Sequence, residues 1–299
     1  MIETSPAKIR LKSEEEIISK WAGFYNKPVV SICCTTYNHE PYIENTIIGF
    51  LTQETSFPFE IIIHDDASTD KTRIKLLEYE KRYKRIFRII QQTENQYSKG
   101  VNVLFEKLIP HAQGDYIALC EGDDFWINKE KLSLQEKALR ENPGISICIH
   151  NAIILNERTQ TQRIFNLSTL PETLGPKDVL RRRWFAPTAS FFFRRKLLEE
   201  KNPANIERDI DLLFHMSLKG RIFYSQEPLS AYGYLPAGSL SEKAASTKKE
   251  LYQHKLRFFC KADRMSHYRY LQWTTFGRIR VAAALVFHTI KHHLKTIHI

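Results

Sequence analysis

Short, continuous apolar runs that alternate with helical segments are the feature that most constrains the fold of this 299-residue chain. Apolar runs occupy 29–34, 59–64, 86–91, 115–120 and 145–150, and helical patterns lie between them at about 41–53, 70–83, 101–110 and 128–141. A strand that is apolar throughout is buried on both faces, and an intervening helix lets consecutive strands run parallel. The pattern predicts an α/β fold with a Rossmann-like, open and mostly parallel sheet flanked by helices.

The rest of the chain divides into a short leader, the remainder of the sheet domain and a helical tail. Ser13 and Glu16 form a capping-box pattern that predicts a helix at 13–25. Further elements are expected as a helix from 175–178, a strand at 189–193, a helix at 209–219 and a strand at 221–224. The expected boundaries are a lead-in at 1–27, a domain at 28–245 with halves at 28–127 and 128–245, and a tail at 246–299.

Composition argues against several classes of protein. The five cysteines form no Cys-x-x-Cys pair, and those in apolar runs are typical of reduced core residues in a cytoplasmic protein. The sequence shows no signal-peptide pattern, and no stretch reaches the roughly 18 apolar residues that would span a bilayer. A dehydrogenase is not expected, because no G-x-G-x-x-G follows any strand.

The positive charge of the chain is concentrated in its tail. Residues 241–299 contain 12 Lys and Arg against 3 Asp and Glu, so the preceding domain is nearly neutral and is not expected to bind nucleic acid. Apolar residues of the tail recur at three- and four-residue steps, at Phe276, Ile279, Ala283, Val286/Phe287, Ile290, Leu294 and Ile297. This basic amphipathic helix is expected to meet a membrane surface through residues 258–299, or else to pack back on the domain.

The run 115–126, Asp-Tyr-Ile-Ala-Leu-Cys-Glu-Gly-Asp-Asp-Phe-Trp, carries the strongest chemical signal. Its apolar strand ends in three carboxylates, Glu121, Asp123 and Asp124. The carboxyl end of a parallel strand faces the crevice where α/β sheets bind ligands, and clustered carboxylates there repel one another unless a cation compensates them. Carboxylate oxygens suit Mg²⁺ or Mn²⁺, which commonly bridge to phosphates. The run therefore predicts a metal site for a phosphorylated substrate.

Two other strand ends carry polar side chains. Thr35-Thr36-Tyr37-Asn38 follows the first strand and is suited to a base or sugar, although a simple turn would have the same composition. Asp65-Asp66-Ala67-Ser68-Thr69-Asp70 follows the second. Ser68 or Asp70 could merely cap the next helix, but an acid at the mouth of an apolar strand can accept a base N–H or a ribose hydroxyl.

A fourth acidic run, Glu207-Arg208-Asp209-Ile210-Asp211, precedes an apolar helical face. Acids in a first helical turn oppose the helix dipole favourably, which is a sufficient structural explanation. The functional alternative is a general base that deprotonates an attacking hydroxyl.

In order and spacing these motifs resemble those of the family-2 glycosyltransferases, which have the GT-A fold. The resemblance covers roughly residues 28–235. It includes Gly114-Asp115-Tyr116 before the acidic run, and Lys131-Leu132 and Gln135 after it. The Glu-Gly-Asp-Asp-aromatic-Trp form, together with Asn95-Gln96-Tyr97-Ser98-Lys99-Gly100, is similar to a bacterial subgroup that builds surface polysaccharides.

The resemblance implies a role for individual residues. Thr35, Tyr37, Asn38, Asp66 and Ser68 would line the nucleotide-sugar pocket, with Asp66 on a uracil-type base. Glu121, Asp123 and Asp124 would form the motif for Mn²⁺ or Mg²⁺, with Asp123 the direct ligand and with Glu121 and Asp123 also contacting the donor. Asp209, eleven residues before Gly220, would be the catalytic base, and Trp126, Thr188 and Asp211 would lie on the acceptor side.

One motif departs from the subgroup, which usually carries Tyr-Arg-x-His after its last core strand. The matching run here is Tyr232-Gly233-Tyr234-Leu235, which lacks the Arg and the His. Arg181, Arg182 and Arg183 are candidate substitutes, although three adjacent arginines are also typical of a solvated helix face.

The function implied is inverting, metal-dependent hexosyl or N-acetylhexosaminyl transfer. The donor would be a UDP-sugar, and the acceptor a glycan or an undecaprenyl-linked oligosaccharide. Such a step belongs to bacterial cell-surface polysaccharide synthesis, as of lipopolysaccharide or capsule, at the inner face of the cytoplasmic membrane. The alternative is a catalytically weak or silent nucleotide-sugar-binding scaffold of the same fold, which the missing Arg and His would favour.

Overall fold

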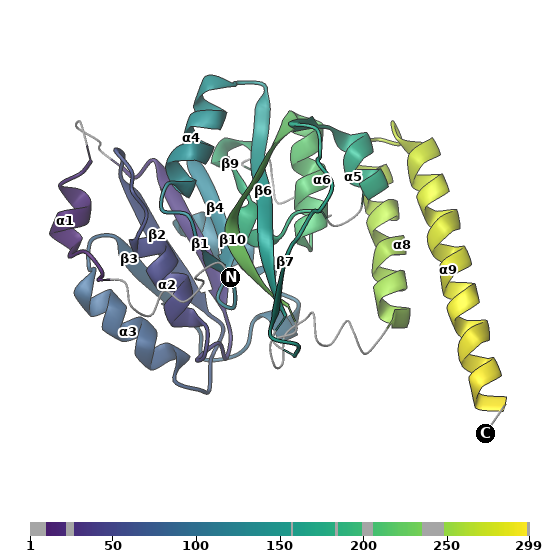
Figure 1. The fold of residues 1–299 in the computed structure, drawn as a ribbon, viewed down its shortest axis with the longest axis horizontal. Coiled ribbons are helices and arrows are strands. Elements are labelled where there is room, and N and C mark those ends of the chain that lie inside the picture. Colours follow the sequence, from purple (N-terminus) through teal and green to yellow (C-terminus); the bar gives the residue numbers. More distant parts are fainter. Residues whose placement is uncertain are drawn as a thin grey trace.

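A ten-stranded, mostly parallel sheet forms the centre of the protein in the computed structural model (Figure 1). The structure describes residues 10–21, 27–156, 158–182, 185–198, 206–234 and 248–297. The strand order is β3-β2-β1-β4-β9-β6-β10-β5, with β7 paired to β6 and β8 to β10. The strands are β1 (Val30–Thr36), β2 (Phe59–Asp65), β3 (Phe87–Gln91), β4 (Tyr116–Glu121), β5 (Phe125–Trp126), β6 (Ile145–Asn156), β7 (Thr161–Ile164), β8 (Thr173–Leu174), β9 (Phe192–Arg194) and β10 (Arg221–Tyr234).

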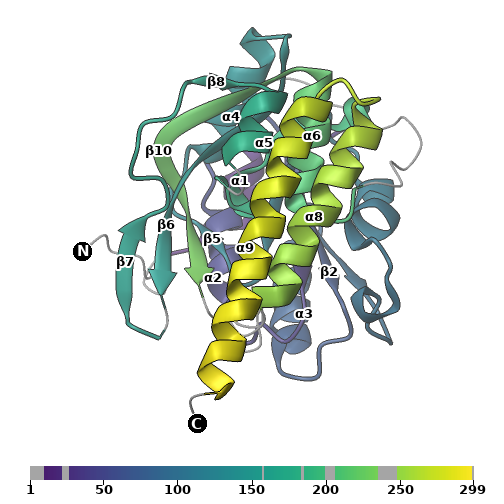
Figure 2. The ribbon, with the colours of Figure 1, turned by 90° about the vertical axis from the view of Figure 1, so that its right-hand side faces the viewer.

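Helices cover both faces of this sheet, and a helical pair closes one end of the molecule. In Figures 1 and 2, α8 and α9 lie side by side at the end opposite α1 and α3. The helices are α1 (Glu14–Ile18), α2 (Ile43–Leu51), α3 (Thr72–Arg82), α4 (Lys131–Glu141), α5 (Pro176–Arg182), α6 (Asp209–Lys219), α8 (Lys248–Met265) and α9 (Leu271–Ile297), with short turns η2 (Tyr97–Lys99), η3 (Leu104–Leu108), η4 (Ile109–His111), η5 (Thr188–Ser190) and η6 (Arg195–Leu198).

The strands β1, β2, β4 and β6, each predicted from an apolar run, are buried on both faces, whereas the edge strand β3 is partly exposed. Along β1, Ile32 and Cys34 contribute to one core cluster and Cys33 to the other, because successive side chains of a strand point to opposite faces. β1 runs parallel to both of its neighbours, β2 and β4. The predicted fold, an open and mostly parallel α/β sheet with a helical C-terminal extension, is confirmed.

Several elements differ from the sequence prediction. The expected helix at 13–25 is limited to α1, which ends at Ile18, and residues 22–25 lie outside the described ones. The expected strand at 145–150 extends to Asn156 as β6. The expected helix at 101–110 is a π-helical turn, η3, followed by the 3₁₀ turn η4, because Pro110 has no N–H to continue an α-helix. The expected strand at 189–193 is the 3₁₀ turn η5 followed by the three-residue strand β9, which runs antiparallel to β4 and β6. The expected strand at 221–224 extends to Tyr234 as β10, with register shifts on either side of Pro228.

The tail forms two helices instead of one continuous helix. The break between α8 and α9 contains His267 and Tyr268, whose φ angles of 49° and 61° lie in the left-handed region. Gly277 of α9 packs so closely on Phe259 of α8 that an added Cβ would lie 2.2 Å from a ring carbon. Among the residues that the structure describes, no helix is both long and apolar enough to cross a membrane.

The apolar stripe that the sequence predicts on the tail is exposed as far as its side chains are described. Phe276, Ile279, Val286 and Phe287 are 60%, 62%, 58% and 69% exposed, whereas Val281 on the opposite side of α9 is buried. The alternative in which this stripe packs back on the domain is therefore wrong for these four residues. The side chains of Ile290, Leu294 and Ile297 lie outside the described set.

Candidate functional site

Three of the predicted polar clusters meet at the carboxyl edge of the sheet. Strand pairing brings Thr35 of β1 opposite Glu121 of β4, and Thr36 opposite Asp65 of β2. The backbone continues this contact beyond the strands, since Gly122 N–H donates to the carbonyl of Thr35 at 2.9 Å. Parallel strands thus collect side chains that are far apart in the sequence into one place.

An acidic cluster, defined here as Glu121, Asp123, Asp124 and Asp209, lies at this edge. Burial, reinforced by the negative charges of Asp123 and Asp209, raises the pKa of Glu121 to about 8. Burial, together with the smaller effect of the negative charges of Asp123 and Glu121, also raises the pKa of Asp124 well above its usual range. The fourth predicted run therefore joins the other three through Asp209, which is the first residue of α6.

The turn that carries three of these acids is held in place by its neighbours. The hydroxyl of Thr46 in α2 lies 2.7 Å from the carbonyl oxygen of Asp124 and 3.0 Å from that of Gly122. A side chain at Gly122 would meet Thr36 Oγ1 and His39 Nδ1, each at 2.7 Å, so the close approach requires glycine. The main chain of the turn is thus positioned independently of any ligand.

Asp124 lies deepest in the cluster. Its Oδ1 accepts a hydrogen bond from Gly233 N–H of β10 at 2.9 Å, while Oδ2 is buried with no hydrogen-bond partner in the described part of the chain. Asp123 is more accessible, and its Oδ2 lies 4.0 Å from His39 Nε2. A buried carboxylate oxygen without a donor is costly, and a cation would compensate it.

The two loops after β1 and β2 are tied to each other. Asn38 N–H donates to Ser68 Oγ at 3.0 Å, and Asn38 Oδ1 accepts from Thr69 N–H at 2.8 Å. Asn38 has a φ of 55°, a left-handed conformation that asparagine tolerates better than most residues. Tyr37, beside this link, is exposed. The loops therefore form one polar wall next to the acidic cluster.

Asp66 organises a third loop in the same region. Its two carboxylate oxygens accept the backbone N–H groups of Gln96 and Tyr97 at 2.7 and 3.0 Å. These hydrogen bonds fix the backbone of the third loop to Asp66 of the second, and the side chain of Tyr97 in that loop is exposed. Each carboxylate oxygen retains a second lone pair, which leaves Asp66 able to accept a base N–H as well. Base binding by Asp66 stays a prediction.

Two other acids of this segment have structural partners. The buried Asp65 pairs with Arg73 Nε at 3.0 Å. Asp70 accepts from Thr72 N–H, at the first residue of α3, at 2.9 Å and from Glu40 N–H at 3.0 Å, so it supports the start of this helix although the N-cap itself is Lys71.

Three residues predicted on the acceptor side have surroundings that do not favour that role. Trp126 is buried, with Nε1 donating to the carbonyl of Ala189 at 3.1 Å. Asp211 is buried beneath α8, where Lys261 Nζ lies 3.0 Å from its Oδ2. Thr188, at the start of η5, is partly exposed. Thr188 is the one of these three residues that is accessible enough to contact an acceptor. The acceptor-side roles of all three remain predictions.

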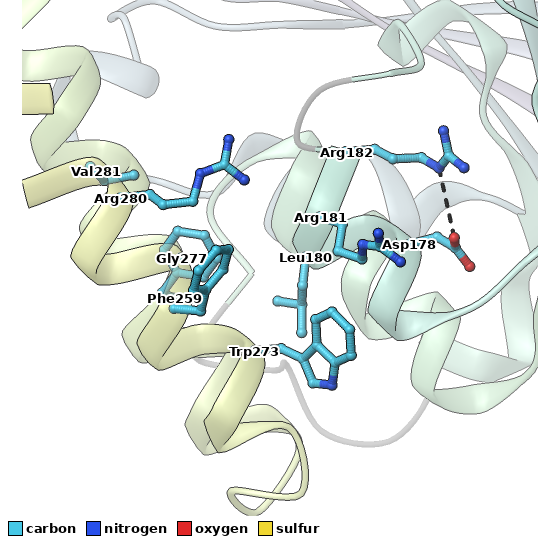
Figure 3. Close-up of a pocket in the computed structure, with 10 residues that line it drawn as sticks. Asp178, Leu180, Arg181, Arg182, Phe259, Trp273, Gly277, Arg280 and Val281 are labelled. Atoms are coloured by element: carbon cyan, nitrogen blue, oxygen red, sulfur yellow. Dashed lines mark ion pairs between the residues drawn. The ribbon is translucent and has the colours of Figure 1, made fainter. Parts of the chain in front are cut away.

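The arginines considered as substitutes for the missing Arg and His lie elsewhere. Arg181 and Arg182 belong to α5, which directly follows β8, and β8 pairs with Ile222 and Phe223 at the start of β10. The acidic cluster meets β10 at its other end, near Gly233. Both side chains line a pocket against α9 instead (Figure 3). Arg183 lies outside the described residues.

Comparison with known proteins identifies the family. The family model described as glycosyl transferase family 2 matches residues 31–201, more than half of the chain. The chain belongs to glycosyl transferase family 2. An uncharacterized protein of Mycobacterium tuberculosis is 37% identical over 206 residues, which cover 68% of this chain and 58% of the relative. The chain thus spans less than two thirds of the length of such mycobacterial relatives.

Two relatives with informative names are also similar. TuaG of Bacillus subtilis, whose name assigns it as a glycosyltransferase to teichuronic acid biosynthesis, is 32% identical over 227 residues, covering 75% of this chain and 86% of TuaG. WfgD of Escherichia coli, named UDP-Glc:alpha-D-GlcNAc-diphosphoundecaprenol beta-1,3-glucosyltransferase, is 33% identical over 131 residues, covering 44% of this chain and 48% of WfgD.

Solved structures share the GT-A-like fold at low sequence identity. Staphylococcus aureus TarS 1–349 in complex with UDP-GlcNAc has a TM-score of 0.57 and 18% identity, with coverage of 78% of this chain and 66% of that one. The Pyrobaculum calidifontis mannosyltransferase PcManGT, in complex with GDP-Man and Mn²⁺, has a TM-score of 0.58 and 18% identity, with coverage of 95% and 80%. At such identity the likeness concerns the fold alone.

The acidic cluster has features that suit a divalent cation without forming a complete cage. Within the described ranges, no three His, Cys, Asp or Glu side chains converge as a preformed metal site. Mg²⁺, however, is usually held by one or two carboxylates together with substrate phosphates. The accessible Asp123, the unpartnered Asp124 Oδ2 and the raised pKa of Glu121 are consistent with that mode of binding.

Three residues beside the acidic cluster were not predicted from the sequence, and only the structure places them there. His39 faces Asp123, Thr46 holds the acidic turn, and Tyr232 of β10 lies near the acidic cluster. Burial, reinforced by the carboxylates of the cluster, raises the pKa of the Tyr232 hydroxyl. The available sequence signals were the position of His39 directly after the first polar cluster and the match of Tyr232 to the family's last-strand motif.

Proposed function

We propose that this protein is an inverting glycosyltransferase that uses a nucleoside-diphosphate sugar, with a UDP-sugar as the leading candidate. The acceptor would be a hydroxyl of a glycan or undecaprenyl-linked oligosaccharide in cell-surface polysaccharide synthesis. The observation that carries this proposal is the proximity of Asp209 to Glu121, which are 88 residues apart in sequence but close enough for one charge to raise the pKa of the other. A metal site and a general base that meet in this way would together serve transfer of a sugar from a diphosphate donor.

The donor would bind across the polar wall built by the first two loops. Thr35, Tyr37, Asn38 and Ser68 would contact its nucleoside, and Asp66 would contact a uracil-type base. This assignment is supported by the exposure of Tyr37 and by the bonds that fix Asn38 to Ser68. UDP as the nucleotide is supported by the names of TarS in complex with UDP-GlcNAc and of WfgD. Residues 28–127 would form the donor half and 128–245 the acceptor half.

A divalent cation, Mn²⁺ or Mg²⁺, would be held chiefly by Asp123, with Glu121 and Asp124 contributing negative charge. When bound, the cation would neutralise the negative charge of the leaving diphosphate. The chain's own residues prepare this site. Thr46 holds the turn, and the Gly233 N–H orients Asp124 so that its second oxygen lacks a donor.

Transfer would proceed in one displacement at the anomeric carbon. The Asp209 carboxylate would accept the proton of the acceptor hydroxyl, and the hydroxyl oxygen would form a bond to the anomeric carbon. The bond from that carbon to the diphosphate oxygen would break, and its electron pair would leave with the nucleoside diphosphate. Attack on the face opposite the leaving group gives inversion. Asp209 suits this role because it begins α6 beside the acids that would hold the donor.

The second candidate is a nucleotide-sugar-binding scaffold with weak or no turnover. It is favoured by Gly233, which stands where the related subgroup has arginine, and by the distance of α5 and its arginines from the site. A basic group that does lie beside the cluster is His39, near Asp123. Binding of UDP without donor hydrolysis or transfer would select this second function.

The site of action would be the inner face of the cytoplasmic membrane. This part of the proposal is supported by the exposed apolar side of α9 and by the name of WfgD, which acts on a diphosphoundecaprenol substrate. A lipid-linked acceptor is presented at such a surface, so an enzyme seated there would meet it without diffusing through solution.

A thermal-shift panel of UDP, GDP, CDP and dTDP, each with and without Mn²⁺, tests the donor and metal assignments together. A ligand at about a hundred times its dissociation constant stabilises a protein by roughly 2.7 kcal/mol, which is readily measured. We expect a shift with UDP that requires Mn²⁺ in the wild type and is lost in Asp123→Asn. Silence across the panel would contradict both assignments.

Asp209→Asn separates binding from chemistry. The variant should keep the UDP and Mn²⁺ shift but lose transfer, because the amide cannot accept the acceptor proton. The matched control is Asp115→Asn, an exposed carboxylate paired with Lys27 at the opposite edge of the sheet. Near-normal transfer by Asp209→Asn would show that another group is the base.

A further inference from the structure

A cavity of about 430 Å³ lies between α5 and α9, away from the acidic cluster. Figure 3 shows Arg181 and Arg182 of α5 on one side of it and Arg280 of α9 on the other. Apolar side chains, among them Trp273 and Phe259, line the space between them. The cavity therefore combines an apolar lining with cationic groups from two separate elements.

The cationic groups of this cavity are poorly compensated. Arg182 Nε lies 3.7 Å from Asp178, but neither Arg181 nor Arg280 has an ion pair with any described carboxylate. Arg181 instead lies over the ring of Trp273, with its guanidinium carbon 5.5 Å from the ring centroid, and Arg280 lies 5.7 Å from that of Phe276. Stacking of this kind orients a guanidinium while leaving its N–H groups available.

Guanidinium groups arranged in this way are suited to phosphate. Each presents paired N–H donors that match two phosphate oxygens, and two such groups from opposite walls can hold one phosphate. Lys177, on the same helix as Arg181, adds positive charge nearby. Its Nζ lies 5.7 Å from the centroid of the Trp273 ring. The chemistry of the cavity therefore selects an anionic group, and a phosphate in particular.

An exposed apolar row adjoins the cavity along α9. At about 100° per residue, Phe276, Ile279, Val286 and Phe287 fall within an arc of roughly 100° on the helix surface. Arg280 lies at the edge of that arc next to the cavity, and Phe276 belongs to both features. A long apolar row beside cationic groups is typical of helices that lie in a membrane interface.

We propose that α9 lies on an anionic phospholipid surface, with the apolar row among the acyl chains and a lipid phosphate held in the cavity by Arg181 and Arg280. A free phosphate would occupy the cavity but leave the apolar row in water, so both features together favour a lipid. The inference extends the membrane part of the proposed function. It assigns a phosphate-binding site distinct from the donor site.

Vesicle flotation with the full chain tests this assignment. Wild type should float with phosphatidylglycerol–phosphatidylcholine vesicles and not with phosphatidylcholine alone. The double variant Arg181→Glu/Arg280→Glu should reduce binding at least tenfold. The control Lys81→Glu/Lys84→Glu makes the same change in net charge on exposed residues of the α3 region and should bind like the wild type. An equal loss of vesicle binding in both double variants would overturn the proposed site, because net charge alone would then explain the binding.

Two further variants separate the contributions of guanidinium and apolar groups. Arg181→Lys/Arg280→Lys keeps the charge but loses paired N–H donation, so it should still weaken binding, and full binding would overturn the phosphate-holding role. Ile279→Ser/Phe287→Ser should abolish flotation, whereas Ile74→Ser/Leu167→Ser, also on exposed apolar residues, should not. Unchanged flotation of the α9 variant would overturn the inserted row.

Soluble ligands distinguish the source of the phosphate. Glycerol phosphate at millimolar concentration should compete with anionic vesicles for wild type. Binding of inorganic phosphate to the cavity without any vesicle binding would overturn the lipid assignment. The thermal shift with UDP and Mn²⁺ should be unchanged in every variant above. Failure of the donor assignment would therefore be recognised separately from failure of this one.

Discussion

Lys261 of α8 and Asp211 of α6 form a buried ion pair, with 3.0 Å between Nζ and Oδ2. The same carboxylate oxygen accepts the backbone N–H groups of Glu207 and Arg208. These bonds fix the residues directly before Asp209, so the docking of the tail and the position of the proposed base depend on one carboxylate. The sequence suggested a substrate-facing Asp211, whereas the structure gives this residue a positioning environment.

Lys261→Met should destabilise the protein strongly. Removing one partner of a buried pair leaves an uncompensated charge, which typically costs about 3–5 kcal/mol. Urea unfolding measures this loss, and the exposed Lys84→Met is the control. Lys261→Met/Asp211→Asn should recover part of the stability, because no buried charge remains. If the single variant were as stable as wild type, the pair would not hold α8 to the domain.

Gly122→Ala should impair donor binding. The new Cβ would lie 2.7 Å from both Thr36 Oγ1 and His39 Nδ1, so the acidic turn or its neighbours must shift, at a cost of about 1–3 kcal/mol. Thermal denaturation and the UDP-induced shift report the two effects. Gly144→Ala is a matched control, since nothing lies within 4 Å of its added Cβ. Equal behaviour of both variants would show that the close approach is unimportant.

Lys131 should make stability depend on pH above neutrality. Burial lowers the pKa of this lysine to about 7, against 10.5 for an exposed lysine. Between these values the unfolded chain binds a proton that the folded protein does not, so stability should rise with pH by about 1.4 kcal/mol per pH unit. Below about pH 7 both states are protonated and this contribution is constant.

Unfolding of wild type and Lys131→Met at pH 7, 8 and 9 provides the measurement. The difference between the two curves isolates Lys131, because other titrating groups are common to both. Wild type should gain stability relative to the variant as pH rises. The amine stacks 3.9 Å above the Trp126 ring and bonds Gln135 at 2.7 Å. A difference independent of pH would mean that the buried amine stays charged throughout.

Asp66→Asn should weaken UDP binding by about tenfold, the equivalent of roughly 1.4 kcal/mol. In asparagine an NH₂ donor replaces one of the two carboxylate oxygens, so one of the two N–H groups that now hold the loop with Tyr97 would face a donor and lose its acceptor. Titration with UDP in the presence of Mn²⁺ measures the loss. Tyr97→Ala tests the same loop without altering Asp66, and undiminished affinity in both would dissociate the loop from donor binding.

The features that the sequence predicts well are those with a local physical cause. β1, β2 and β4 could be placed because strands buried on both faces are apolar at most positions, without the alternation of a half-exposed strand. The capping box was readable in the same way, and both of its hydrogen bonds, between Ser13 and Glu16, are present. The convergence of the first three clusters follows from parallel pairing alone.

Features set by distant partners could not be predicted. The three-residue strand β9 exists because β4 and β6 offer hydrogen bonds on both sides. The role of Asp211 depends on Lys261, 50 residues later. The tail's apolar period was correct, but which face of α9 is exposed depends on the packing of Gly277 on Phe259.

The length of β10 has a consequence for acceptor choice. This 14-residue strand begins beside β8, which leads into α5, and ends where Gly233 donates to Asp124. Because it is hydrogen-bonded along β6, it acts as a stiff strut between those two ends. A protein resting on lipid through α5 and α9 would hold its reaction centre at a constant height above the bilayer. Such an enzyme would extend only those lipid-linked glycans whose growing end extends far enough from the membrane to enter the site, in addition to recognising the terminal sugar.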